Sequence, residues 1–202
     1  MAQAARIGAL AVGHGVPQQK VNEMLAAATT RGKAPTLVVV GRGQTLQVRD
    51  VRLEVMHPDQ LPFPDPNARS MVLHVECKGA TCLMCADVGK SFEEWIVAAT
   101  EPTDVDLLKV AHHASASSSS LEFLQHVSPR WAAISVGRNS YGHPSEATVG
   151  RLAEAGAVAL RTDVNGAVEL TTMWPSGKPI VTTYGDRRAK MPLFRRLRTI
   201  TK

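Results

Sequence analysis

The sequence predicts one α/β domain, with or without a tail, on three observations. Short apolar runs of the kind that form strands alternate along the 202 residues with longer stretches whose apolar residues recur every three or four positions, as in helices. Hydrophobic residues make up 44% of the chain, which is enough for a core, and charged residues make up an ordinary 20%. Aromatic residues are only 4%, so we expect a core built mainly from Val, Leu, Ile and Ala.

The N-terminal part of the chain predicts strands, a helix and a loop. Val21, Met24 and Ala28 fall on one face at helical spacing, which indicates the helix. The apolar run after Pro35 indicates a buried strand, and the alternation that follows indicates a half-buried one. Four prolines in eleven residues then require an irregular loop. We expect strands over 7–12, 37–40 and 47–56, the helix over 17–30 and the loop over 57–67.

From residue 70 onward, the pattern is a hairpin followed by helices and strands in turn. Lys78-Gly79 marks the turn of the hairpin, and a run of serines stands where the second helix of this part needs an N-cap. Such an order favours a mixed sheet with flanking helices. We expect strands over 70–77, 81–85, 105–110, 132–136, 158–161 and 167–171, and helices over 91–100, 120–127 and 145–155.

The net charge of +5 comes from basic residues in the C-terminal segment. Seven of the 23 Lys and Arg residues lie beyond Asp186, where there is no acid, so residues 1–186 carry 16 bases against 18 acids. Clustered bases attract phosphate, and the tail also suits anionic lipid, while a solubilising tail is the simpler interpretation. We therefore predict a basic tail over 185–202 that follows a domain over 1–184.

The cysteines and the lack of a leader indicate the compartment. An odd count of three cysteines, Cys77, Cys82 and Cys85, is typical of a reducing environment, and the three are better explained as small buried hydrophobes than as zinc ligands. No run of about 18 apolar residues could span a membrane. We expect a cytoplasmic protein whose association with a membrane, if any, is through a partner.

Histidines and an aspartate follow several predicted strands. His57, Asp87, His112 with His113, and His143 each come after a different strand. One such histidine is more often a hydrogen-bonded loop residue, but the recurrence at successive strand ends, where loops converge, favours a shared site. Imidazole and carboxylate are ligands for Zn²⁺, Mn²⁺ or Fe²⁺, and such an ion makes hydroxide from water at neutral pH.

The stretch DVDLLKVAHHASASSSSLEFLQHVSPRWAAISVGRNSYGHP, followed by RTDVNGAVEL, resembles the end of the metallo-β-lactamase-fold domain of ComEC-type DNA-uptake (competence) proteins. The resemblance covers roughly residues 35–172, and more weakly 7–34, and the HH…GHP…RTD spacing is specific. It implies an αββα sandwich, of which this chain would be the C-terminal half. It also implies phosphodiesterase or nuclease activity, with single-stranded DNA as the substrate.

The resemblance also implies roles for individual residues. Asp87 would bridge two metal ions, His112 or His113 would be a late histidine ligand, and His57 would be the middle one. Asp87, His112 and His143 would be the catalytic residues. The substrate would be bound by Ser115, Ser118, Asn139 and His143.

This chain departs from the family pattern in two ways. Ala86 and Ala114 replace glycines, which adds a methyl group where the backbone needs positive φ or close approach. The first metal motif, of HxHxDH or HxDxDH type, is absent, so we expect only weak binding of Zn²⁺ or Mn²⁺ and a second chain or upstream segment that supplies the rest. An incomplete domain leaves an apolar sheet face open, so we also expect homo-oligomers. The alternatives are a non-catalytic remnant or interaction module, or a hydrolase of the same fold with another substrate.

Overall fold

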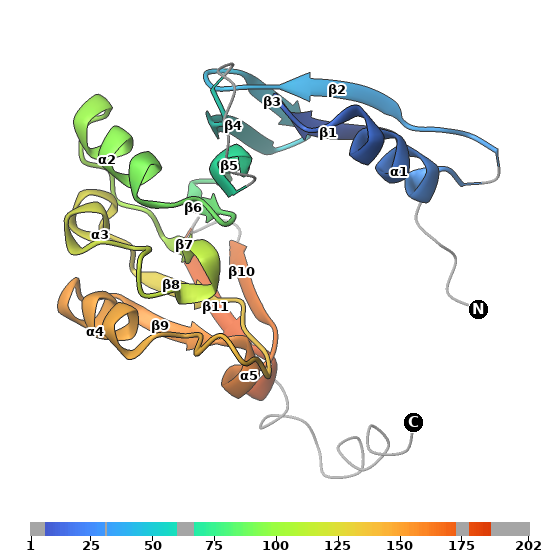
Figure 1. Ribbon diagram of the computed structural model, residues 1–202. Helices are drawn as coiled ribbons and strands as arrows, with labels where there is room; N and C mark the ends of the chain where they lie inside the picture. The colour runs from blue at the N-terminus through green and yellow to red at the C-terminus, as the bar shows by residue number, and fades with distance from the viewer. Residues whose placement is uncertain (1–6, 31, 60–66, 173–177, 187–202) are drawn as a thin grey trace, which may run out of the picture.

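A seven-stranded mixed sheet forms the centre of the molecule (Figure 1), in a computed structural model that describes residues 7–30, 32–59, 67–172 and 178–186. The strand order is β3-β4-β5-β6-β7-β8-β9. The strands from β3 to β6 pair antiparallel, and those from β6 to β9 pair parallel. The strands are β3 (Thr45–Val48), β4 (Val51–His57), β5 (Val72–Cys77), β6 (Ala80–Cys85), β7 (Leu107–Lys109), β8 (Trp131–Ile134) and β9 (Val158–Arg161).

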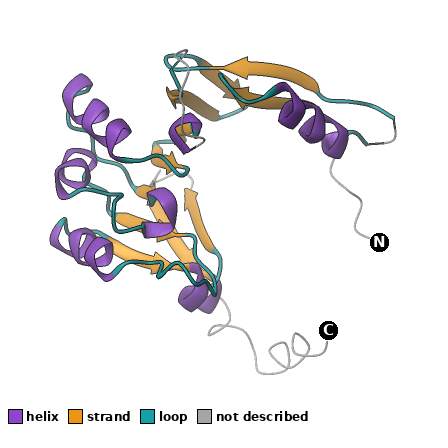
Figure 2. Cartoon of the chain, viewed as in Figure 1, coloured by secondary structure: helices purple, strands orange, loops and turns teal. Residues whose placement is uncertain are grey.

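Three helices connect the parallel strands and lie along one face of the sheet (Figure 2). They are α2 (Lys90–Ala99), α3 (Leu121–Val127) and α4 (Glu146–Glu154). Phe92, Leu124 and Leu152 from these helices are almost fully buried in one core cluster, together with Leu108 and Ile134 from the sheet. The predicted mixed sheet with flanking helices is confirmed.

Local sequence explains where two of these elements begin and turn. The hairpin between β5 and β6 turns at Lys78 and Gly79, whose φ angles of 49° and 81° are the left-handed pair that a tight hairpin needs. The helix α3 begins after Ser120, whose side chain accepts a hydrogen bond from the backbone N–H of Phe123 at 3.3 Å. The predicted hairpin and N-cap are both confirmed.

The predicted strand over 47–56 is wrong in its extent, because a turn at Arg49 and Asp50 divides it into β3 and β4. The two strands pair with Val48 opposite Val51 and Leu46 opposite Leu53. The apolar positions therefore shift from even to odd numbers across the turn, and that change of phase is the signal of a hairpin.

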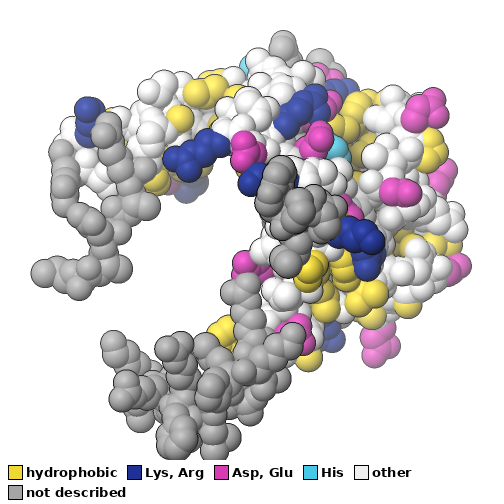
Figure 3. All heavy atoms as spheres, turned by 180° about the vertical axis from the view of Figure 1, so that it is seen from behind, with side chains coloured by type: hydrophobic (Ala, Val, Ile, Leu, Met, Phe, Trp, Pro, Cys, Tyr) yellow, Lys and Arg dark blue, Asp and Glu magenta, His cyan; other side chains and the backbone are white. Residues whose placement is uncertain are grey.

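The ends of the chain lie outside the main sheet, so the strands expected over 37–40 and 167–171 do not join the others in one sheet. β1 (Ala9–Gly13) and β2 (Thr36–Val40) form a two-stranded parallel sheet joined by α1 (Gln18–Ala28), and this N-terminal unit projects to one side (Figure 1). Val40 is buried, but Leu37 and Val39 are 38% and 49% exposed, so β2 is not the buried strand expected. Hydrophobic side chains reach the surface over this unit (Figure 3).

After β9 the chain forms the short helix α5 (Thr162–Asn165) and a separate antiparallel pair, β10 (Val168–Thr172) and β11 (Pro179–Thr183). The predicted basic tail lies outside the described residues beyond Asp186, and the boundaries of the domain stay a prediction. In the described ranges, no helix has the length and apolar character needed to cross a membrane.

Candidate functional site

The sheet topology brings the predicted site residues to one edge. β4 runs antiparallel to β5, and β5 antiparallel to β6, so β4 points the same way as β6, β7 and β8. His57 ends β4, and Asp87 comes two residues after the end of β6. His112 and His113 lie in the short helix η2 (Ala111–Ala114) after β7, and His143 lies in the segment after β8. The carboxyl ends of these four strands therefore meet where the chemistry was predicted.

Backbone hydrogen bonds tie the three loops at this edge together. The N–H of His112 donates to the carbonyl oxygen of Ala86 at 3.0 Å, which joins η2 to the end of β6. The N–H of Ser145 donates to the carbonyl oxygen of Ala114 at 2.9 Å, which joins the His143 loop to η2. Because these bonds join backbone to backbone, they fix the relative positions of the Cα atoms that carry the candidate site residues.

Three consecutive residues of η2 adopt left-handed backbone conformations. The φ angles are 47° at His112, 52° at His113 and 62° at Ala114. For a residue with a Cβ, this conformation costs about 1–2 kcal/mol, and such strain is typical of functional sites. The prediction that Ala114 stands where the backbone favours glycine is confirmed, whereas Ala86 does not have a positive φ.

Asp87 and His113 form the central pair of the site. Nε2 of His113 lies 3.7 Å from Oδ1 of Asp87, and the two side chains are 45% and 39% exposed, so solvent reaches both. Nδ1 of His113 lies 2.6 Å from the carbonyl oxygen of Ser135. Because a carbonyl can only accept, Nδ1 carries the proton, and in the neutral ring Nε2 then presents a lone pair toward Asp87. Histidines that bind metals are commonly oriented by such a bond from the second ring nitrogen.

A second group of rings lies beside this pair. The rings of His112 and His143 meet edge to face, with 5.9 Å between centroids, and Tyr141 stacks on His143 at 6.0 Å. The structure thus brings His113 to Asp87 and sets His112 against His143. The catalytic and metal-binding assignments of these histidines stay predictions.

His57 differs from the other predicted ligands because it is buried. Its ring is 6% exposed and meets Phe92 of α2 edge to face at 5.7 Å. Its Nε2 lies 2.7 Å from the carbonyl oxygen of Ala68, so this nitrogen carries a proton rather than a free lone pair. Burial lowers the pKa of His57, and the bond to Ala68 opposes this effect. In this arrangement His57 packs the core, and its role as a metal ligand stays a prediction.

The two serines predicted to bind substrate, Ser115 and Ser118, instead form hydrogen bonds within their own loop. Ser115 and Ser118 are 6% and 1% exposed. The hydroxyl of Ser118 donates to the carbonyl oxygens of Ala111 and Ser115, both at 3.1 Å, and the hydroxyl of Ser115 lies 3.0 Å from that of Ser117. Their substrate-binding assignment stays a prediction, and the geometry favours a supporting role.

Residues 115–120 form the serine loop. Two charged residues from the helices bind its backbone. Glu93 of α2 is 2% exposed, and its carboxylate accepts from the backbone N–H groups of Ser119 and Ser120, the second at 2.8 Å. Arg151 of α4 donates to the carbonyl oxygens of Ser118 at 2.9 Å and Ser119 at 2.8 Å. The loop beside the site is therefore fixed from two directions by charge-assisted hydrogen bonds.

Asn139 holds the loop that carries Tyr141 and His143. Its amide nitrogen donates to the carbonyl oxygens of Gly137 at 2.9 Å and His143 at 2.8 Å. Its amide oxygen accepts from the N–H groups of Tyr141 at 3.0 Å and His143 at 3.1 Å. These four bonds use the full capacity of the side chain, so in this structure Asn139 orders the loop. Its assignment as a substrate ligand stays a prediction.

Lys109, at the end of β7, is a charged residue that the sequence reasoning missed. Its ammonium lies 3.5 Å from the carbonyl oxygen of Ala86, next to Asp87. Burial lowers the pKa of Lys109, and the negative charge of Asp87 opposes this effect. The signal was a lysine inside the otherwise apolar strand LLKV.

Comparisons with known proteins cover most of the chain. No family model matches the chain. The chain is 34% identical over 158 residues to ComE operon protein 3 of Bacillus subtilis strain 168, which is 76% of this chain and 20% of that protein. It is 37% identical over 128 residues to competence protein ComA of Neisseria gonorrhoeae, which is 62% of this chain and 18% of that protein. The chain is a relative of the ComEC-type competence proteins. It spans about one fifth of the length of the curated relatives it matches.

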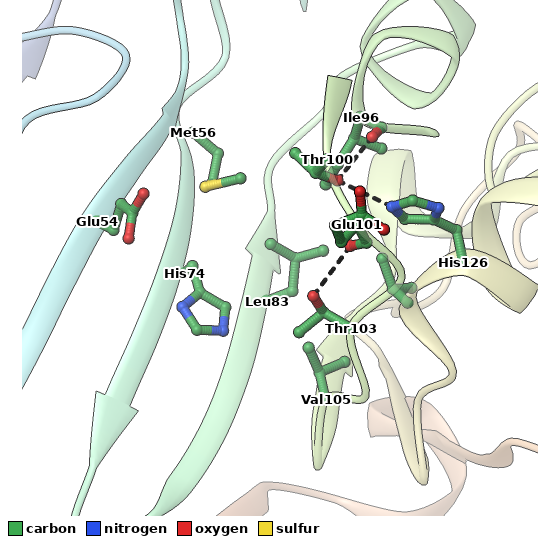
Figure 4. Close-up of a pocket in the computed structure, with 11 residues that line it drawn as sticks. Glu54, Met56, His74, Leu83, Ile96, Thr100, Glu101, Thr103, Val105 and His126 are labelled. Atoms are coloured by element: carbon green, nitrogen blue, oxygen red, sulfur yellow. Dashed lines mark hydrogen bonds between the residues drawn. The ribbon is translucent and has the colours of Figure 1, made fainter. Parts of the chain in front are cut away.

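Two of the cavities among the described residues of this relative of the competence proteins differ in their relation to the site. One, of about 320 Å³, lies at the site and is lined by His113, Tyr141 and His143 among others. The other, of about 220 Å³, lies between β4–β6 and the ends of α2 and α3 (Figure 4). It includes His74, whose buried Nε2 has no hydrogen-bond partner in the described ranges, and His126, whose Nε2 bonds Thr100 at 2.8 Å. None of the predicted site residues lines this second cavity.

Metal-binding groups are incomplete in the described part of the chain. No three His, Cys, Asp or Glu residues there are placed to hold one ion together. Cys82 and Cys85 are buried and free of disulfides, and burial raises the pKa of Cys82 to about 11, which keeps that thiol protonated at neutral pH. Asp87 and His113 have the chemistry of two ligands, but they do not make a full set.

Proposed function

We propose that this chain contributes part of a metal-dependent phosphodiesterase site that cleaves single-stranded DNA during DNA uptake. The observation that carries the proposal is the exposed pair of Asp87 and His113, 3.7 Å apart, with Nδ1 of His113 held by Ser135. Bonds of about 2.0–2.2 Å from one ion to an imidazole nitrogen and a carboxylate oxygen are compatible with such a separation. The kinship with competence proteins supports DNA as the substrate.

The residues of this chain would bind and orient the substrate. Asp87 and His113 would hold a Zn²⁺ or Mn²⁺ ion, which would supply an acidified water and polarise the phosphoryl group. Lys109, close to Asp87, and Arg138, in the His143 loop, would attract the DNA backbone. His143, stacked on Tyr141 and against His112, would face the phosphodiester. Further ligands would come from a segment of the HxHxDH or HxDxDH type, on a partner chain or elsewhere in a longer protein.

A second candidate, a non-catalytic interaction module, is favoured by one observation. The described residues contain no group of three potential ligands, so the ions that the reaction needs would be poorly held by this chain alone.

The test is cleavage of 5′-labelled single-stranded DNA in the presence of Mn²⁺ or Zn²⁺. The chain alone should leave the strand intact, and co-expression with a segment that carries the missing motif should restore cleavage. Asp87→Asn and His113→Gln should each abolish that restored activity. Asp50→Asn is the matched control, because Asp50 lies in the exposed β3–β4 turn, where it pairs with Lys78.

Three results would contradict the proposal in different ways. Restored cleavage that survives Asp87→Asn would remove this pair from the reaction. No cleavage by the co-expressed assembly, although it folds and binds metal, would favour the interaction module. Metal-dependent cleavage by the chain alone would show that it already holds a complete site.

A further inference from the structure

The cavity beside the candidate site is bordered by a side chain that the proposed reaction does not use. Tyr141 is 82% exposed, the largest fraction among the exposed large hydrophobic side chains of the described residues. An aromatic ring that packs a core would be covered, so Tyr141 is not a core residue. One neighbour of the ring is His143, on which it stacks with an angle of 22° between the planes.

The loop around Tyr141 is held by hydrogen bonds of its own. The amide of Asn139 makes its four hydrogen bonds within this loop, one of them to the N–H of Tyr141 itself. In the same cavity lining, the hydroxyl of Thr162 accepts from the N–H of Val136 at 2.8 Å. A loop that its own hydrogen bonds hold in place loses less conformational entropy on binding than a loop without them.

The cavity has the size and the chemistry for a planar ring with a phosphate attached. Its volume of about 320 Å³ is at the lower end of the range of about 300–1,000 Å³ for small-molecule sites. Val136 supplies an apolar wall, and Tyr141 supplies an aromatic surface. Arg138 also lines the cavity and forms no ion pair with the part of the chain that the structure describes, so its guanidinium is available to a phosphate.

We propose that Tyr141 is a stacking platform for a nucleobase of single-stranded DNA, with Arg138 on the adjoining phosphate. The proposal rests on the proposed function for the substrate, and on the cavity and the exposed ring for the position. A base stacked on Tyr141 would place the neighbouring phosphodiester beside His143 and the pair of Asp87 and His113. Stacking on an aromatic ring is tolerant of sequence, because every base has a π-face.

The test is binding of two labelled eight-nucleotide strands to the full chain, followed by fluorescence anisotropy. One strand is oligothymidylate, and the other is an abasic strand with the same number of phosphates. Tyr141→Ala should weaken binding of oligothymidylate about tenfold, the size of a lost base–aromatic stack, and leave the abasic strand unchanged. Tyr141→Phe should bind both strands as the unmodified chain does.

Two controls separate stacking from charge and from folding. Arg138→Gln should weaken binding of both strands by the same factor and lower the salt dependence of binding, because it removes a phosphate contact. Tyr184→Ala, at the other tyrosine of the chain, should leave both affinities unchanged, and circular dichroism should show that every variant is folded.

The outcomes separate a failure of the stacking platform from a failure of the proposed function. Suppose that the unmodified chain binds oligothymidylate. If Tyr141→Ala then has no effect on this binding, or weakens binding of the abasic strand by the same factor, the stacking platform is wrong while the proposed function stands. If the unmodified chain binds neither strand, with or without Mn²⁺, the stacking platform is wrong, and the proposed function is then decided by the cleavage assay of the co-expressed assembly.

Discussion

The N-terminal unit of β1, α1 and β2 and the unit of β6, α2 and β7 share one plan, two parallel strands joined by a helix. Their burial is very different. α2 buries Phe92, Glu93 and Ile96 in the main core, whereas α1 buries Val21 and Ala28 and leaves Met24 40% exposed. A strand–helix–strand arrangement alone is therefore not enough to form a buried core. The β6–β7 unit is covered because further strands pair beside it and α3 packs beside α2.

The site depends on this difference. Asp87, His113 and the serine loop all lie on the densely packed unit and its neighbours, where hydrogen bonds from Glu93 and Arg151 fix the loops. Strained backbone, as at Ala114, persists only where the surroundings determine it. The first of three pairs of substitutions compares the two parts, and the other two test what fixes the loops of the densely packed part.

The largest effect is expected from Leu124→Ala in α3. Leu124 is 0% exposed, so the substitution should lower the free energy of unfolding by about 2–5 kcal/mol, from lost burial and the cavity left behind. Leu37→Ala in β2 is the matched change in the N-terminal unit, and it should cost less than about 1 kcal/mol because Leu37 is 38% exposed. Urea unfolding followed by circular dichroism measures both. Equal costs would mean that the two units are equally well packed.

The next effect concerns the bond between α2 and the serine loop. Glu93→Gln replaces a carboxylate that accepts from two N–H groups by an amide, one end of which can only donate, so one backbone donor loses its partner. The free energy of unfolding should fall by about 1–3 kcal/mol. Hydrogen exchange should also become faster at Ser119 and Ser120. Glu94→Gln, next along the helix in an exposed ion pair with Lys90, should change stability by less than about 1 kcal/mol. A similar loss at both positions would contradict the special role of Glu93.

The smallest effect is expected from relief of backbone strain. Ala114 and Ala111 are 0% and 1% exposed, but only Ala114 has a positive φ. Ala111→Gly should lose a buried methyl group and gain chain freedom in the unfolded state, both of which destabilise. Ala114→Gly has the same losses but is relieved of about 1–2 kcal/mol of left-handed strain, so it should be more stable than Ala111→Gly by that amount. Thermal unfolding of the two variants measures the difference, and no difference would mean that the loop carries no strain at Ala114.

Much of the fold could be predicted because its signals are local. The helix over 91–100, the turn at Lys78-Gly79 and the N-cap at Ser120 depend on signals within a few residues, and each is present as expected. The division of 47–56 into two strands was also local, in the phase shift between Val48 and Val51. The separate pairing of β1 with β2 was not, because an apolar strand does not specify which neighbour it joins.

The sequence by itself determined which residue types stand at the strand ends and the kinship with competence proteins, since both follow from the order of residues. Only the tertiary structure decided how those residues are used. It set His113 rather than His112 against Asp87, buried His57 beside Phe92 and turned Ser115 and Ser118 inward. The reason is physical: a side chain's direction depends on backbone angles such as those of His112 and His113, and these are held by hydrogen bonds from strands and loops far away in the sequence.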